Sequence, residues 1–172
     1  SFRQLETDKA LYKYFPVISN AVYDIVGVQL RNNARIGATV FTKHGFSDLI
    51  TALLCLDTYV VLYKGGTIKL EDFLNEKTPR KDILVKVIIK KENLKTSFQC
   101  VRKSKADYSV LNMAVSKNEK GEVRISVGAR PSKARLAHKS MECLSQDFYD
   151  KSVFETIKEE IKYDSNMRGT KE

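Results

Sequence analysis

The chain has 172 residues, of which 42% are hydrophobic and 30% are charged, the composition of an ordinary globular protein. No apolar run approaches the length of a membrane span, and the first residues lack a signal-peptide core, so we expect a cytoplasmic protein without a membrane-bound part. The net charge of +9 is spread along the chain between acidic residues. This pattern favours a solvated basic surface over a nucleic-acid binder.

Metal and redox chemistry are not expected from the cysteines and histidines. Cys55, Cys100 and Cys143 are odd in number, and no pair has the spacing of a zinc site, an iron–sulfur cluster or a C-x-x-C motif. His44 and His138 are isolated from each other and from the cysteines. We therefore predict no metal site in this chain.

The first third of the chain predicts helices around a polar loop. Residues 2–26 read as two helices divided by Pro16, and Gly27 is a suitable stop for the second. The segment 29–46 reads as a loop with short extended pieces at 28–30 and 38–42. Its glycines permit tight turns, and such a loop can also lay backbone N–H groups against a phosphate or ribityl chain.

The rest of the chain predicts strands followed by helices. Ser47 and Asp48 are suitable caps for a helix over 49–56. We expect a helical turn at 71–75, a linker at 90–95, later helices at about 133–144 and 151–163, and a polar, partly disordered tail at 164–172. β-Branched and aromatic runs predict strands at 58–63, 67–70, 83–89, 97–101, 110–116 and 123–127. Gly65-Gly66 predicts a tight hairpin turn between the first two of them.

These elements indicate an α+β fold with antiparallel sheets. We predict a first part, residues 1–92, with an antiparallel sheet and helices, and a smaller second part, residues 96–172, with a three-stranded antiparallel sheet packed on helices. The strand at 83–89 is apolar on both faces and is predicted to be buried. No G-x-G-x-x-G motif follows a strand, so a Rossmann nucleotide site is not supported.

Short motifs along nearly the whole chain resemble the FAD-binding subunits of molybdenum hydroxylases, the xanthine dehydrogenase and carbon monoxide dehydrogenase group. The segment from Gln29 to Leu49 resembles the family's "IRN-x-x-T-I-G-G-N" loop and the "SDL" that follows it. The other similar segments stand in the family's order: Phe15–Ala21, Leu54–Val61, Phe73, Asp82–Leu84, Ser97–Gln99, Lys105–Asp107 and Val110–Val115.

The resemblance implies a role in electron transfer. In that family the subunit holds FAD, takes electrons from iron–sulfur centres of a partner and usually passes them to NAD. Substrate chemistry occurs on a molybdopterin subunit, so no catalytic acid or base is expected here, and no activity from this chain alone. The family's subdomain with the "A-G-G-T-D/N" loop precedes the matched region, so a separate chain is the expected source of that part of the site.

The resemblance also implies which residues contact FAD. Asp48 is equally suited to be only a helix cap, and Phe41, Ile83 and Leu84 are simpler to explain as core. The segment 37–39 is the one that the resemblance favours as functional. The full set of implied contacts is Ala34, Ile36, Gly37, Ala38, Thr39, Phe41, Thr42, Asp48, Ile83, Leu84 and Gln99.

Several departures from the family pattern leave a second function open. The family's "GGN" stands here as Gly37-Ala38-Thr39, where alanine adds a methyl group and threonine replaces an amide. The "SFQK" lysine is Cys100, and one of two adjacent acids is Tyr108. The alternative is therefore a non-catalytic assembly domain with a degenerate cofactor site.

Overall fold

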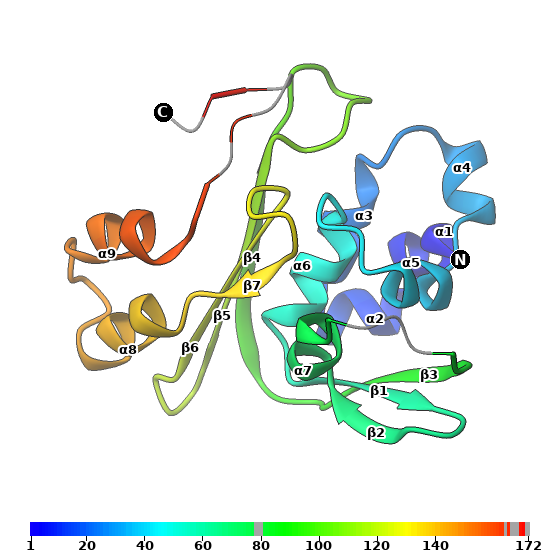
Figure 1. The fold of residues 1–172 in the computed structure, drawn as a ribbon, viewed down its shortest axis with the longest axis horizontal. Helices are drawn as coiled ribbons and strands as arrows, with labels where there is room; N and C mark the ends of the chain where they lie inside the picture. The colour runs from blue at the N-terminus through cyan, green and yellow to red at the C-terminus, as the bar shows by residue number, and fades with distance from the viewer. Residues whose placement is uncertain (78–80, 164, 166–168, 171–172) are drawn as a thin grey trace.

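The computed structural model describes residues 1–77, 81–163, 165 and 169–170. Helices surround two antiparallel sheets, so the predicted α+β class is confirmed (Figure 1). The predicted division between residues 92 and 96 stays a prediction, because the larger hydrophobic core takes side chains from both halves of the chain. The predicted disordered tail falls largely on residues outside the described ones.

Three short helices begin the chain where two were predicted: α1 (Phe2–Thr7), α2 (Lys9–Tyr14) and α3 (Pro16–Tyr23). Asp8 explains the extra break. Its backbone is extended and ends α1, and its carboxylate accepts a hydrogen bond from the backbone N–H of Leu11, which starts α2. Pro16 occupies the first turn of α3, as predicted.

The predicted loop at residues 29–46 is wrong over most of its length. It contains two further helices, α4 (Val28–Asn33) and α5 (Ile36–Thr42), where extended pieces were expected. Gly27, the predicted helix stop, instead precedes α4 as its N-cap. Such short helices have little stability of their own and form here because tertiary packing holds them, a contribution that local sequence does not reveal.

Helix α6 (Asp48–Leu54) lies at the centre of the molecule, and all seven of its residues are buried. The predicted cap is confirmed, since Ser47 Oγ accepts a hydrogen bond from the N–H of Ile50 at 3.3 Å. After α6 come β1 (Thr58–Leu62), β2 (Gly66–Lys69) and α7 (Leu70–Asn75), close to the predicted strand, hairpin and helical turn.

The next strand, β3 (Leu84–Ile89), pairs antiparallel with the free side of β1 and completes a sheet with the order β2-β1-β3. β3 is therefore an edge strand, and its predicted burial on both faces is wrong. The side chain of Val85 is 56% exposed. Hydrophobicity alone does not tell a central strand from an edge strand, because the order of strands in the sheet decides it.

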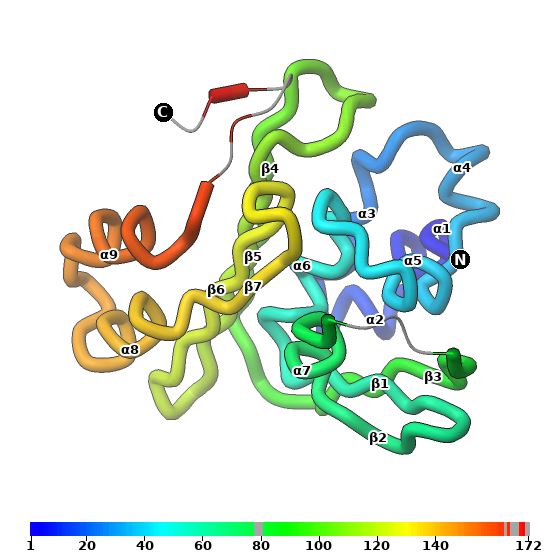
Figure 2. Tube along the Cα trace, viewed as in Figure 1, coloured from blue at the N-terminus to red at the C-terminus, as the bar shows by residue number. Residues whose placement is uncertain are grey.

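The second sheet has four strands, one more than predicted: β4 (Leu94–Val101), β5 (Leu111–Asn118), β6 (Val123–Gly128) and β7 (Arg135–Leu136). The predicted linker is shorter, because β4 already starts at Leu94. β7 occupies the start of the predicted 133–144 helix, so α8 (His138–Gln146) begins later, and α9 (Val153–Glu160) follows. α6 covers one face of this sheet, and α8 lies on the other (Figures 1 and 2).

Gly45 holds the segment before α6 against the connection between β6 and β7. Its carbonyl accepts a hydrogen bond from the N–H of Ala129 at 2.7 Å. A Cβ atom at Gly45 would lie 2.0 Å from the carbonyl oxygen of Ser132, so the two backbones can approach only because the side chain is absent.

We expect Gly45→Ala to lower the free energy of unfolding by about 1–3 kcal/mol, because one backbone must move away from the other. Urea denaturation measures the change. The matched control is Gly37→Ala, whose Cβ would make an ordinary contact of 3.8 Å with Leu84 Cδ2. Equal unfolding midpoints for the two variants would contradict the close approach.

Candidate functional site

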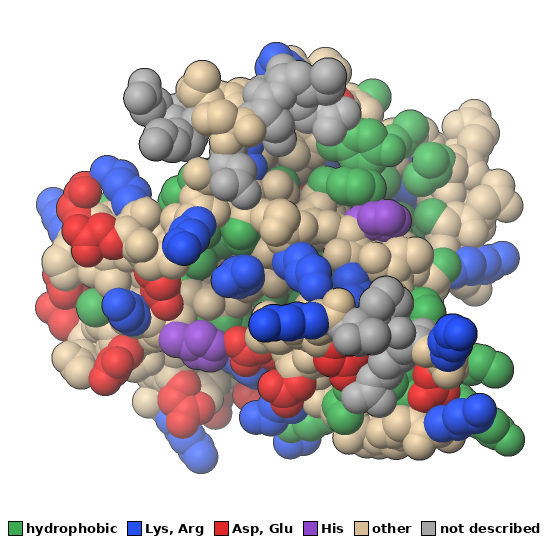
Figure 3. All heavy atoms as spheres, in the orientation of Figure 1, with side chains coloured by type: hydrophobic (Ala, Val, Ile, Leu, Met, Phe, Trp, Pro, Cys, Tyr) green, Lys and Arg blue, Asp and Glu red, His purple; other side chains and the backbone are tan. Residues whose placement is uncertain are grey.

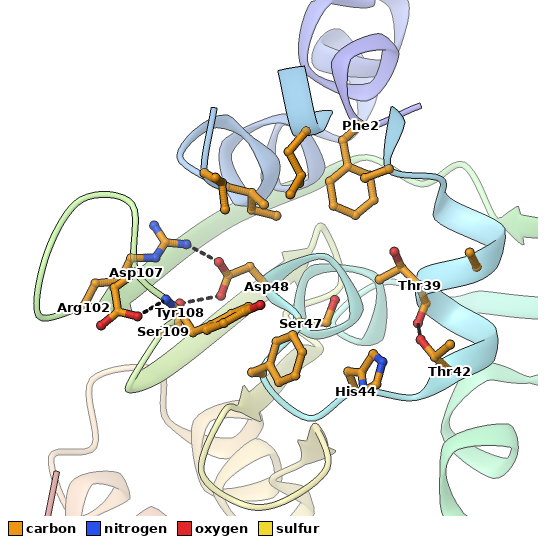
Figure 4. Close-up of a pocket in the computed structure, with 16 residues that line it drawn as sticks. Phe2, Thr39, Thr42, His44, Ser47, Asp48, Arg102, Asp107, Tyr108 and Ser109 are labelled. Atoms are coloured by element: carbon orange, nitrogen blue, oxygen red, sulfur yellow. Dashed lines mark hydrogen bonds and ion pairs between the residues drawn. The ribbon is translucent and has the colours of Figure 1, made fainter. Parts of the chain in front are cut away.

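A pocket of about 300 Å³ lies where the N-terminal helices, α5, the start of α6 and the segment between β4 and β5 meet (Figure 4). Figure 3 shows hydrophobic side chains gathered beside a histidine on the molecular surface. The pocket is lined by Phe2, Ile25, Val26, Leu30, Ala34, Ala38, Thr39, Thr42, His44, Phe46, Ser47, Asp48, Arg102, Asp107, Tyr108 and Ser109.

Helical geometry decides which of the predicted FAD contacts face this pocket. Ala38 and Thr42 are spaced four residues apart on α5 and share one face with Thr39. Ala34, which lies between α4 and α5, adds another small side chain to this side of the pocket. The opposite side of α5 faces the core, where Val40 is fully buried and the Phe41 ring lies 6.1 Å from the ring of Phe73. The side of α5 that faces the pocket therefore carries small side chains, and the side that packs against the core carries large ones.

The structure brings five of the eleven predicted residues together at the pocket: Ala34, Ala38, Thr39, Thr42 and Asp48. The other six do not line it. Gly37 lies beside Leu84 in the contact between α5 and β3. Ile83 is 67% exposed next to β3, and Gln99 is exposed on β4. Ile36 and Phe41 pack against the main core.

A buried ion pair forms the polar end of the pocket (Figure 4). The carboxylate of Asp48 is paired with the guanidinium of Arg102, and the two side chains are 5% and 9% exposed. One oxygen, Asp48 Oδ1, also accepts hydrogen bonds from Ser109 Oγ and Asn112 Nδ2, each at 2.6 Å. The N-cap of α6 is Ser47, so the Asp48 carboxylate is free for these other contacts. Through them Asp48 connects α6 to both ends of the segment between β4 and β5.

Arg102 keeps an unused donor at this site. Its Nε atom is buried and has no hydrogen-bond partner within the described part of the chain. A buried donor without a partner costs about 1–3 kcal/mol, so such an atom marks a place where an acceptor would be stabilised. The atom has almost no accessible surface, so it is not itself exposed to the pocket that other atoms of Arg102 line.

Three aromatic rings make a wall of the pocket. His44 stacks on Phe46 with ring centroids 5.1 Å apart, and Phe46 meets Tyr108 at 4.6 Å with the rings tilted by 57°. Phe46 and Tyr108 remain 41% and 49% exposed. Such rings offer a planar ligand a flat apolar surface.

The sequence prediction missed the residues from the β4–β5 segment and the aromatic wall. The motif at Lys105–Asp107 pointed to the right segment but not to Arg102, which lies 54 positions after Asp48 in the sequence. Tyr108, which stands where the family pattern has an acid, lines the pocket. Only the folded chain brings Arg102, Phe46 and Tyr108 to one place.

Neither Cys55 nor Cys100 forms a reactive thiolate, and the described residues do not form a metal centre. Burial raises the pKa of the Cys55 thiol to about 12 and also raises the pKa of Cys100, so both thiols stay protonated at neutral pH. Within the described part of the chain, no group of three or more metal-ligating side chains is found, and no helix has the length and hydrophobicity to cross a bilayer.

The model of the FAD binding domain in molybdopterin dehydrogenase matches residues 1–91, more than half of the chain. The chain belongs to this family of FAD-binding domains. The resemblance noted in the sequence is thereby confirmed. A search of curated proteins by sequence gave no match.

Solved structures of a quinoline 2-oxidoreductase and of CO dehydrogenases have the same fold. Quinoline 2-oxidoreductase from Pseudomonas putida 86 has a TM-score of 0.85 and 19% sequence identity to this chain. The match covers 99% of this chain and 65% of the quinoline 2-oxidoreductase chain. For reconstituted CO dehydrogenase from Oligotropha carboxidovorans, the match covers 99% of this chain and 66% of the CO dehydrogenase chain, with a TM-score of 0.87 and 16% identity. The Cu,Mo-CO dehydrogenase in a cyanide-inactivated form gives a TM-score of 0.86, also at 16% identity. This FAD-domain chain therefore spans about 65% of the first of these chains.

We expect Asp48→Asn to lower the free energy of unfolding of this FAD-family domain by about 3–5 kcal/mol, because Arg102 is left buried without its partner charge. Adding Arg102→Met to it should recover part of that loss. Urea denaturation of both single variants and the double variant gives the coupling energy.

The exposed pair Lys158–Glu155, at 65% and 73% exposure, is the control for the buried one. Its loss in Glu155→Ala should change stability by less than about 1 kcal/mol. Additive effects of the Asp48 and Arg102 changes would show that the two residues do not act as a pair.

Proposed function

We propose that the chain is part of the FAD-binding, electron-transferring component of a molybdenum hydroxylase. The observation that carries this proposal is the pocket itself, since the matched segment, residues 1–91, supplies the small-residue face of α5 and the Asp48 end. FAD, when bound, would accept electrons one at a time from iron–sulfur centres and pass them on as a pair to an acceptor such as NAD. The residues of this chain would bind and orient it.

The pocket fits one part of FAD. Its volume of about 300 Å³ is at the lower end of the range for ligand pockets, which is enough for a ring system but not for a whole dinucleotide. The aromatic wall of His44, Phe46 and Tyr108 suits a planar ring, and the Asp48–Arg102 pair gives the pocket a polar end. Ala38 and Thr39 leave room for the ligand on the opposite side.

The rest of the cofactor site would come from outside the 172 residues, because this chain spans about 65% of the quinoline 2-oxidoreductase chain that it matches. We propose a segment or separate polypeptide that completes the FAD site, an iron–sulfur subunit as electron donor and a molybdopterin subunit for substrate oxidation. An acceptor such as NAD would take the electrons. The six predicted contacts outside the pocket, including Gly37 and Leu84, belong in this proposal to parts of FAD that extend beyond it.

A second candidate function is an assembly domain with a degenerate cofactor site. The observation in its favour is that the Asp48 carboxylate already has three partners, Arg102, Ser109 and Asn112, and so has little capacity left for a ligand. Ala38 and Thr39, which stand in place of the family's glycine and asparagine, also support this second candidate.

We expect Ala38→Phe to weaken FAD binding at least about tenfold, which corresponds to about 1.4 kcal/mol, because the larger side chain would fill the pocket. Fluorescence quenching of FAD by the full chain, and the visible spectrum of the complex purified from its host, measure the binding. Parallel titrations with FMN and ADP identify which end of FAD the pocket holds.

Ala10→Phe is the matched control, since Ala10 is also an exposed alanine on a helix and lies outside the pocket. It should bind FAD as the unmodified chain does. A complex without flavin, or equal FAD binding by the Ala38 and Ala10 variants, would favour the assembly domain.

A further inference from the structure

The three-stranded sheet has one covered face and one open face. Helices α5 and α7 contact its strands, and the sheet lies along the lower edge of the molecule in Figures 1 and 2. In the strand register, Tyr59 lies between Lys69 and Ile88, and Val61 lies between Thr67 and Lys86. These six residues alternate with the buried Val60 and Leu62, so they form the open face of the sheet.

This open face is apolar along its middle strand and basic along its edges. Tyr59 and Val61 are half-buried, Ile88 is 38% exposed, and Lys69 and Lys86 are exposed. The three strands contain no aspartate or glutamate. No carboxylate of the described residues pairs with Lys69 or Lys86. Both charges therefore lack compensation within the described chain.

Lys90, which directly follows β3, is a lysine whose charge is offset within the chain. Its ammonium group lies 3.0 Å from Asp57 Oδ2 and 4.8 Å from the centre of the Tyr59 ring. The pairing raises the pKa of Lys90, mainly through its hydrogen bonds with Tyr59 and Asp57. Among the described residues, Lys69 and Lys86 have no comparable neighbour, so an acidic group of a partner would offset their charge.

We propose that the open face of the three-stranded sheet docks an acidic surface of a protein partner. Val61 and Ile88 would form the apolar centre of the contact beside the Tyr59 ring, which Lys90 partly covers, and Lys69 and Lys86 would pair with carboxylates at its rim. This arrangement is that of known protein interfaces, which have aromatic and aliphatic centres and polar rims. Opposite charges at the rim would speed association and set the orientation.

The same features argue against two other occupants. Sheets that bind single-stranded nucleic acid present free aromatic rings on which bases stack, whereas Lys90 already lies over the ring of Tyr59. A second copy of the chain would present the same basic strands without a carboxylate, so Lys69 and Lys86 would find no acidic partner on them. A protein surface with carboxylates and an apolar centre satisfies both the sheet and its lysines.

The docking proposal stands whether or not the pocket binds FAD, because it uses a different surface. The experiment is zero-length carbodiimide cross-linking of the complex purified from its host after nuclease treatment, read by mass spectrometry. We expect amide links between Lys69 or Lys86 and carboxylates of one partner protein. Acetylation of these two lysines should be at least several-fold slower in the complex than in the isolated chain.

Charge reversal tests the same contact independently. The double variant Lys69→Glu/Lys86→Glu should lose the partner, whereas Lys139→Glu/Lys151→Glu should keep it with the same change in net charge. Lys139 and Lys151 are exposed at α8 and near α9, far along the chain from this sheet. Thermal unfolding confirms that both variants fold.

Three results would overturn the proposal. These are purification of the chain alone or as a homodimer, release of all bound material by nuclease, and equal acetylation rates of Lys69 and Lys86 in the complex and in the isolated chain. Loss of the partner in both charge-reversal variants would show a general effect of charge and would also reject a specific face.

Discussion

The structure depends on the burial of α6. Every residue of this helix is buried, so the carboxylate of Asp48 at its start is buried too and needs partners to offset its desolvation. Arg102, Ser109 and Asn112 supply them from the ends of β4 and β5. Asn112 also accepts a hydrogen bond at Oδ1 from Thr51 Oγ1 at 2.7 Å, so the network returns to the same helix. One polar network thus fixes the central helix against the four-stranded sheet.

The pocket follows from this constraint. The ion pair places the segment after β4 close to the start of α6, and Tyr108 of that segment then reaches Phe46. On the other side, Gly45 lets the chain before α6 lie against the connection between β6 and β7. The aromatic wall and the polar end are therefore positioned by the same contacts that hold the core together. A change that unfolds this network would also be expected to remove the pocket.

Signals from neighbouring residues allowed some of the helices and strands to be predicted from the sequence. The cap at Ser47, the Gly65-Gly66 hairpin and the β-branched runs gave α6, β1 and β2 close to their observed positions, because each depends on neighbouring residues. Helices α4 and α5 were missed because helices of six or seven residues depend on tertiary packing. The exposure of Val85 was missed because strand order, not strand composition, puts β3 at an edge.

The candidate site also contains residues that the sequence located and residues that it did not. Family motifs located Ala38, Thr39 and Asp48, but the helical turn of α5 then separated Ala38 and Thr42 from Phe41 and Gly37. A prediction that treated residues 34–42 as a loop had no basis for this separation. The partner of Asp48 was also beyond sequence reasoning, because Arg102 is distant in the chain and spacing carries no information on such pairs.

The chemistry of Arg102 is the same whichever function the pocket serves. A lysine at this position would neutralise Asp48 and leave no buried Nε donor, so pairing alone does not require arginine. Arginine adds an N–H group that has no partner within the described chain and costs about 1–3 kcal/mol while it stays unpaired. The atom has almost no accessible surface for a ligand to meet, so its cost falls alike on a cofactor site and on an assembly domain. Arg102 therefore acts here through its pairing with Asp48, which holds the start of α6 against the segment after β4 under either function.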